Sequence, residues 1–131
     1  MYDNADRLGL NINAYFAAVF ERYSQSKDVS ALIADPCFSE DDVDLYLDFA
    51  IFIARNHGER AAIDYCDRLR GYFLRQNRDE LVAKVLVIQA QLFDDLGVGM
   101  SRDLYALEAA EAFAMFGQYP AAEKALAMVK A

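Results

Sequence analysis

The residues that could act as a nucleophile and its base are few in this sequence. His57 is the only histidine, so any Ser-His-Asp or Cys-His arrangement must use it as the base. Nothing around Cys37 resembles the setting of an activated thiol. We expect His57 to end a helix, where an imidazolium complements the negative end of the helix dipole. The sequence therefore predicts no catalytic residue.

Two sets of residues have the chemistry of metal ligands, but neither has the spacing. The acidic run 40–42, followed by Asp44 and Asp48, lacks the central glycine and the distal glutamate of a calcium loop. Cys37 and Cys66 lie far apart and neither belongs to a C-x-x-C pair, so a zinc site and a disulfide framework both lack support. We expect no metal and no cofactor, and we assign the acidic run to the first turn of a helix.

The charge balance bears on the class of partner. The net charge is −8 and the isoelectric point is near 4.5, which repels phosphate backbones and anionic lipid headgroups. Residues 96–105 look superficially like a DNA-binding turn and recognition helix. That helix would turn Asp103, Glu108 and Glu111 toward phosphate, with only Arg102 to attract it. We expect neither nucleic acid nor a membrane surface as a partner.

The length and the apolar runs set the class of protein. A chain of 131 residues fits one domain, and we expect a single domain over residues 1–131. No run approaches the roughly 20 apolar residues of a membrane-spanning helix. The first residues, 1–7, carry acids rather than the basic start of a signal peptide. We expect a cytoplasmic protein.

The apolar spacing predicts an all-α fold of six main helices with short connections. Ser39 is a suitable N-cap for the second helix, and Gly97 and Gly117 stand where left-handed caps end the fourth and fifth. The expected helices cover residues 4–23, 39–56, 59–75, 79–96, 101–116 and 119–130.

A glycine turn near the end of the chain follows a known pattern. Gly117 ends a helix, Tyr119 follows two positions later, and the small Ala122 begins the next helix. Upstream, Ala110 and Phe113 occupy the small and aromatic positions of the preceding helix. This segment resembles the middle of a tetratricopeptide repeat, a helix-turn-helix unit of about 34 residues.

A second segment, 57–69, is similar to the same turn, although the aromatic residue is missing and the spacing is one residue short. The resemblance covers about half the chain, with irregular repeats. It implies stacked antiparallel helix pairs that present a groove to a peptide or helix. In size, charge and helix content the chain also looks similar to the small acidic chaperones of bacterial type III secretion. Helical-repeat regions of bacterial transcriptional regulators are a comparable resemblance.

The expected helices 4–23, 39–56 and 79–96 are apolar nearly all the way round. Such helices are either inner layers of a stack or surfaces that meet a partner. If the last two line a groove, a subset of their residues should stay accessible to the partner. The predicted partner-binding residues are Tyr46, Phe49, Ile53, Val85, Gln89 and Phe93.

Six arginines fall within residues 55–78, although the chain is acidic overall. One interpretation is a solvated helix face interleaved with aspartates. The other is an electrostatic rim for an acidic partner segment, formed by Arg68, Arg70, Arg75 and Arg78.

These observations favour a protein-binding helical adaptor or chaperone that shields an amphipathic or extended segment of a partner protein. The alternative is a structural or regulatory domain that buries the same surface against a second copy, as a homodimer. A small all-α enzyme with a tyrosine-lined pocket is the third alternative.

Overall fold

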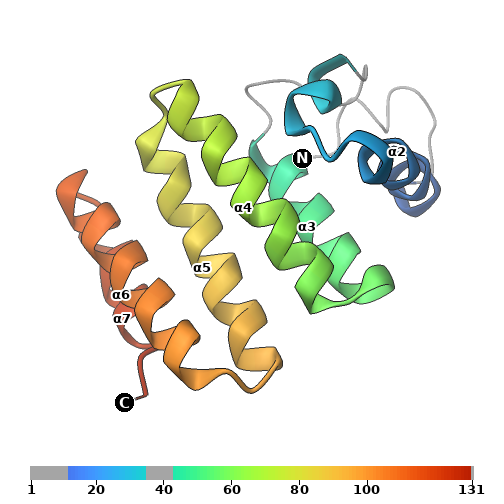
Figure 1. The fold of residues 1–131 in the computed structure, drawn as a ribbon. Coiled ribbons are helices and arrows are strands. Elements are labelled where there is room, and N and C mark those ends of the chain that lie inside the picture. The colour runs from blue at the N-terminus through green and yellow to red at the C-terminus, as the bar shows by residue number, and fades with distance from the viewer. Residues whose placement is uncertain (1–11, 35–42, 131) are drawn as a thin grey trace. The chain divides into compact units, whose positions relative to one another are not determined.

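The computed structural model describes residues 12–34 and 43–130 of the chain (Figure 1). In this part of the chain there is no strand, and the predicted all-α fold of helical hairpins is confirmed. The expected N-terminal parts of the first two helices, together with Ser39, the acidic run 40–42 and Cys37, lie outside the described residues. The elements are α2 (Ile12–Ser26), the 3-10 helix η1 (Val29–Ala34), α3 (Val43–His57), α4 (Glu59–Arg75), α5 (Asp79–Asp95), α6 (Gly99–Met115) and α7 (Tyr119–Leu126).

The internal contacts of the chain group it into two compact units, residues 1–68 and 69–131, with the boundary inside α4. The expectation of one cooperative domain over residues 1–131 stays a prediction.

The first unit is built around aromatic side chains from α2, α3 and α4. The ring of Phe49 lies 5.3 Å from that of Phe16 and 5.2 Å from that of Tyr65, measured between centroids. Tyr23 meets Tyr65 edge to face at 5.4 Å. The Tyr65 hydroxyl donates to the carbonyl oxygen of Tyr46 at 3.0 Å, which satisfies a polar group inside an apolar core. These contacts fix three helices through one cluster of rings.

Helix α2 ends at Ser26, one turn later than Tyr23, where the sequence predicts its end. The polar residues after Tyr23 continue the helix with exposed side chains, so their polarity does not mark its end. The helix stops at Lys27, which has a φ of 53° and donates its N–H to the carbonyl of Tyr23. A left-handed residue at this position is a common way to close a helix.

Helices α4 to α7 begin at a constant interval along the chain, at positions 59, 79, 99 and 119. Each of the three turns between them contains one left-handed residue: Asn77, Gly97 and Gly117, with φ of 58°, 77° and 72°. The next N–H in each turn bonds at 2.9 Å to the carbonyl of a phenylalanine four positions before the left-handed residue. Since α4 begins at position 59 and α6 at position 99, a pair of these helices takes up more chain than a tetratricopeptide repeat of about 34 residues.

Two helix ends in this part of the chain differ from the sequence prediction by two residues or more. Helix α6 starts at Gly99 with Val98 as its N-cap, so Ser101 lies inside the helix. Helix α7 ends at Leu126 instead of Lys130. The chain after it tightens into i→i+3 hydrogen bonds, and the backbone N–H of Lys130 donates to Asp103 Oδ1 at 3.1 Å. A tertiary contact, which the local sequence does not encode, ends this helix.

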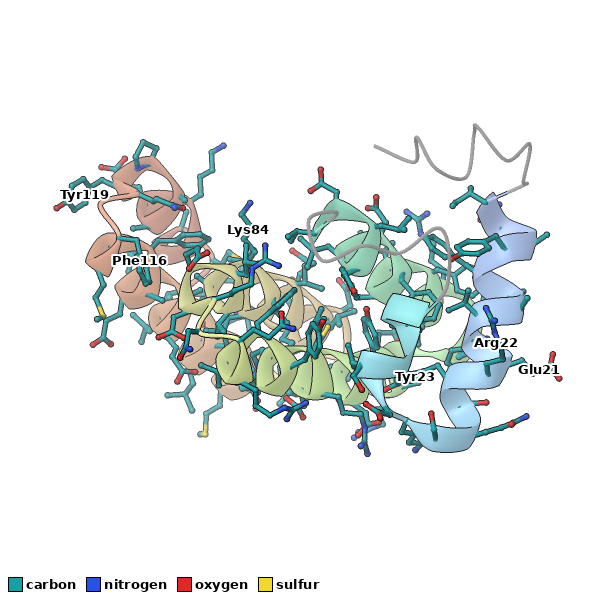
Figure 2. The ribbon with its side chains drawn as sticks, turned by 90° about the horizontal axis from the view of Figure 1, so that it is seen from above. Glu21, Arg22, Tyr23, Lys84, Phe116 and Tyr119 are labelled. Carbon is teal, nitrogen blue, oxygen red and sulfur yellow. The ribbon has the colours of Figure 1, made fainter. Side chains whose placement is uncertain are left out.

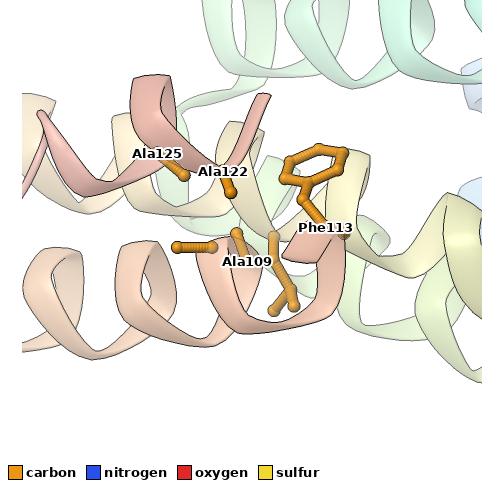
Figure 3. Packing of buried hydrophobic residues seen from close by; sticks show 7 residues of the cluster. Ala109, Phe113, Ala122 and Ala125 are labelled. Carbon is orange, nitrogen blue, oxygen red and sulfur yellow. The ribbon is translucent and has the colours of Figure 1, made fainter. Parts of the chain in front are cut away.

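The second unit has a core in which α6 packs against both α5 and α7. Small side chains dominate it, which lets the three helix backbones approach closely. Phe113 is the single large aromatic group in this cluster (Figure 3). The buried cluster comprises Ala83, Leu86, Ala109, Ala110, Phe113, Ala122 and Ala125.

Candidate functional site

Five of the six residues predicted to bind a partner are completely buried: Tyr46, Phe49, Ile53, Val85 and Gln89. The expected groove along α3 and α5 is therefore wrong at these positions. Both helices use their apolar residues as core, the first of the two interpretations that the sequence leaves open. A side chain without accessible surface offers nothing for a partner to contact.

The sixth residue, Phe93, is only partly buried, but it already has a neighbour within the chain. Its ring lies 5.0 Å from the ring of Tyr105 at an interplanar angle of 59°, which joins α5 to α6. Arg70 places its guanidinium 5.6 Å from the centroid of the same Tyr105 ring. Phe93 is thus part of a packed aromatic and cationic cluster.

The four arginines predicted to form an electrostatic rim have separate environments. Arg68 forms an ion pair of 3.1 Å with Asp64, one helical turn away. This contact is the kind that the solvated-face interpretation expects. Arg78 lies 5.7 Å from the Phe73 ring, Arg70 packs on Tyr105 as described, and Arg75 is exposed.

The residues considered for catalysis pack against other side chains or lie in the core. His57 is the last residue of α3, as expected, and its ring stacks on Phe20 at a centroid distance of 3.8 Å and an angle of 12°. Cys66 is completely buried, where a thiol behaves as a small apolar group. Within residues 12–34 and 43–130 there is no cluster of three or more His, Cys, Asp or Glu side chains that would hold a metal ion.

Helix α6 has an inverted distribution of side chains. It buries the small residues Ala106, Ala109 and Ala110, together with Phe113. Its Met and Leu residues point to solvent instead: Met100, Leu104, Leu107 and Met115, which we call the α6 stripe, are all exposed. Met100 and Met115 are each 78% exposed and Leu104 is 60% exposed. An ordinary surface helix does the reverse, because burying large apolar groups is what stabilises it.

The α6 stripe is one continuous face of the helix. At 3.6 residues per turn its four side chains fall within about 80° of arc. Ala109 lies on the opposite side of the helix, toward the core. Glu111 falls within the stripe and Glu108 lies beside it, and both are exposed.

The exposed apolar surface continues into the turn after α6. Phe116 and Tyr119, at either side of Gly117, are 48% and 64% exposed, and Figure 2 shows both side chains at this turn. Leu126 on α7 is 50% exposed. Seven of the ten exposed large hydrophobic residues among those described fall between positions 99 and 126. Such a concentration is typical of an interaction surface, whereas single exposed apolar residues are scattered.

An ionic cluster anchors the start of α6. Arg102 donates to Asp94 Oδ1 at 2.8 Å and to Asp103 Oδ1 at 3.0 Å, and Lys130 Nζ lies 3.4 Å from the same Asp94 oxygen. The Arg102 hydrogen bond lowers the pKa of the Asp94 carboxyl below its usual value. The cluster connects α6 to the end of α5 and to the C-terminal segment, so it holds the stripe in place.

An open depression of about 450 Å³ adjoins the N-terminal end of the α6 stripe. Met100 and Leu104 form part of its wall, and the ionic cluster contributes the rest. The lining residues are Gly99, Met100, Arg102, Asp103, Leu104 and Lys130.

The predicted site residues include none of the α6 stripe. The signal was present: Met100, Leu104 and Leu107 recur at helical spacing, as do the alanines on the opposite face. Spacing identifies two faces but does not say which of two apolar faces is buried. The neighbouring helices determine which face is buried. Here α5 and α7 lie close to α6, and the small alanine side chains fit between them.

Comparison with protein-family models, curated proteins and solved structures finds no match to this chain. Among the described residues, every helix is too short or too polar to cross a membrane.

Proposed function

We propose that the chain is a protein-binding helical module and that the α6 stripe, extended by Phe116 and Tyr119, is its docking surface. The inversion of α6 carries this proposal, because the helix places alanines in the core and leaves Met and Leu in water. Exposing large apolar side chains in this way has an unfavourable free energy of hydration that a partner would relieve.

The chemistry of the exposed residues suits a protein partner. Methionine adapts its shape to different surfaces, and aromatic residues supply large contact areas with little loss of conformational entropy. Fully burying one Leu or Met side chain contributes about 1.5–3 kcal/mol. Micromolar binding needs about 8 kcal/mol beyond an association cost of at least about 4 kcal/mol, so it requires burial of the whole stripe together with Phe116 and Tyr119.

We propose the biological role of an adaptor or chaperone in the cytoplasm, comparable with the bacterial type III secretion chaperones that the chain resembles. The turn from α6 to α7 supports only the resemblance to a tetratricopeptide repeat: Gly117 is left-handed, Tyr119 follows it and Ala122 is buried against the preceding helix. The comparison with the secretion chaperones rests on size, charge and helix content. The wider interval between helix starts is a departure from the tetratricopeptide pattern.

Site-specific photocrosslinking in cells that naturally contain the protein tests the proposal. A photoreactive benzoylphenylalanine in place of Leu104 should give a discrete adduct with another protein. The same group in place of Leu74, which is 51% exposed on α4, is the matched control and should give none. An adduct with twice the mass of the chain would instead indicate the homodimer. Equal labelling at both positions, or none at Leu104, would contradict the docking surface.

A further inference from the structure

The charges around the α6 stripe have one sign. Glu111 lies within the stripe and Glu108 beside it, and no Lys, Arg or His occurs in the sequence between Asp103 and Glu123. Within residues 12–34 and 43–130 neither Glu108 nor Glu111 forms an ion pair. The nearest cation along the helix, Arg102, is engaged by two aspartates. In the part of the chain that the structure describes, the stripe therefore presents apolar surface together with negative charge that no ion pair compensates.

A second copy of this helix fits the stripe poorly. In an antiparallel pairing that sets Met100 against Met115 of the other copy, Leu104 meets Glu111 and buries a carboxylate against an apolar group. In a parallel pairing in register, Glu111 meets Glu111. Burying a charge without a partner is unfavourable, and like charges that face each other repel. The pattern disfavours pairing through α6 itself.

The geometry of the face fits another helix. The stripe follows a straight helical ridge from Met100 to Met115, about 22 Å long at 1.5 Å per residue. Ridges of this kind pack into the grooves of a neighbouring helix, with apolar residues at intervals of three and four. The described part of the chain has no sheet edge to which an extended segment could add as a strand.

We infer that the α6 stripe binds a basic amphipathic helix of a partner protein, with Leu, Met or Phe toward the stripe and Lys or Arg opposite Glu108 and Glu111. This inference rests on the proposed function and names its class of partner. Apolar burial supplies most of the affinity, and the two carboxylates select the charge and the register of the bound helix.

Two synthetic helical peptides test the inference against the full chain by isothermal titration calorimetry. Both have about 18 residues, enough to cover the stripe, and an identical leucine stripe. One carries lysine at the flanking positions and the other carries glutamate. The lysine peptide should bind at least about tenfold more tightly, and its affinity should fall as salt rises from about 50 to 500 mM.

Variants of the chain locate the effect. Glu108→Gln with Glu111→Gln should remove most of the difference between the two peptides. Glu21→Gln with Asp44→Asn changes the net charge equally at two exposed acids of the other unit, and it should preserve the difference. Leu104→Asp should abolish binding of the lysine peptide, whereas Leu74→Asp should not.

The outcomes separate the inference from the proposed function. If both peptides bind equally and Leu104→Asp abolishes both, the choice of a basic partner is overturned and the docking surface stands. If neither peptide binds, or if binding survives Leu104→Asp, the helix inference fails, and photocrosslinking at Leu104 then decides the proposed function independently. A dimer in sedimentation that Leu104→Asp dissociates would overturn the inference in favour of a second copy.

Discussion

Arg102 donates a hydrogen bond of 2.8 Å to Asp94, so the first turn of α6 is fastened to the last turn of α5. The Arg102 side chain is only 14% exposed, so water competes little for this hydrogen bond. Both residues flank the turn that contains Gly97. Turn geometry and ionic contact therefore act on the same hairpin, and the position of the α6 stripe depends on both.

The Asp94–Arg102 pair should make this hairpin sensitive to acid. Arg102 lowers the pKa of Asp94 below its usual 3.8, with a further contribution from Lys130. A depressed pKa in the folded state means that the stabilisation is fully present above about pH 4 and is lost as the pH falls through the lowered value. Urea midpoints of the native chain should drop more steeply below about pH 4 than those of Arg102→Gln. Parallel curves for the two proteins would refute the assignment.

The aromatic cluster of the first unit should be the most sensitive site for truncation. Phe49 is completely buried between Phe16 and Tyr65, so Phe49→Ala should lower the free energy of unfolding by about 3–5 kcal/mol. Phe93→Ala should cost less, because Phe93 is only partly buried. Chemical denaturation of both variants measures this. A loss of free energy of unfolding below about 1 kcal/mol for Phe49→Ala would contradict the burial of this side chain.

Substitutions at the left-handed residues Asn77 and Gly117 should affect stability differently. A Cβ at Gly117 would meet no neighbouring atom within 4 Å, so Gly117→Ala should cost only the left-handed backbone strain, about 1–2 kcal/mol. Asn77→Gly should leave stability nearly unchanged, because asparagine tolerates this conformation and glycine adopts it freely. Thermal unfolding of both variants tests the pair, and an equal loss in both would show that another contact controls these turns.

The turn positions show how much of this fold could be predicted from the sequence. Glycine at 97 and 117 marked two helix ends correctly, and the helix 59–75 has the expected bounds. Glycine positions alone do not reveal the regular interval, because Asn77 takes the place of glycine in the first of the three turns. The candidate site was misplaced for a different reason: apolar content identified α3 and α5 as unusual, but burial depends on neighbours far along the chain, as for Phe49 and Tyr65.

Alkaline pH should destabilise the first unit through its buried tyrosines. Burial raises the pKa of the Tyr65 hydroxyl well above 10.0, and the neighbouring Cys66 adds to the shift. A raised pKa leaves stability intact below about pH 10 and reduces it at higher pH, because the unfolded chain ionises first. The denaturation midpoint should therefore decline above about pH 10, less steeply in Tyr65→Phe. Equal declines in the native chain and in Tyr65→Phe would contradict the role of burial.

The inversion of α6 gives a matched pair of substitutions whose effects run against the usual rule for apolar residues. Leu104 is 60% exposed, so Leu104→Ala should change the free energy of unfolding by no more than about 0.5 kcal/mol. Ala109 is completely buried against α5 and α7, so Ala109→Leu should overfill the core and cost about 1–3 kcal/mol.

Denaturant unfolding of the two variants measures both free-energy changes. Binding of the lysine peptide is the second, independent measurement. Leu104→Ala should weaken binding while folding is preserved, because the side chain contributes surface only to the complex. Ala109→Leu should retain binding in whatever fraction remains folded, because its side chain lies on the face opposite the stripe. If Leu104→Ala unfolds the protein, or if Ala109→Leu is neutral, the two faces of α6 have the opposite assignment, and the docking surface must lie elsewhere.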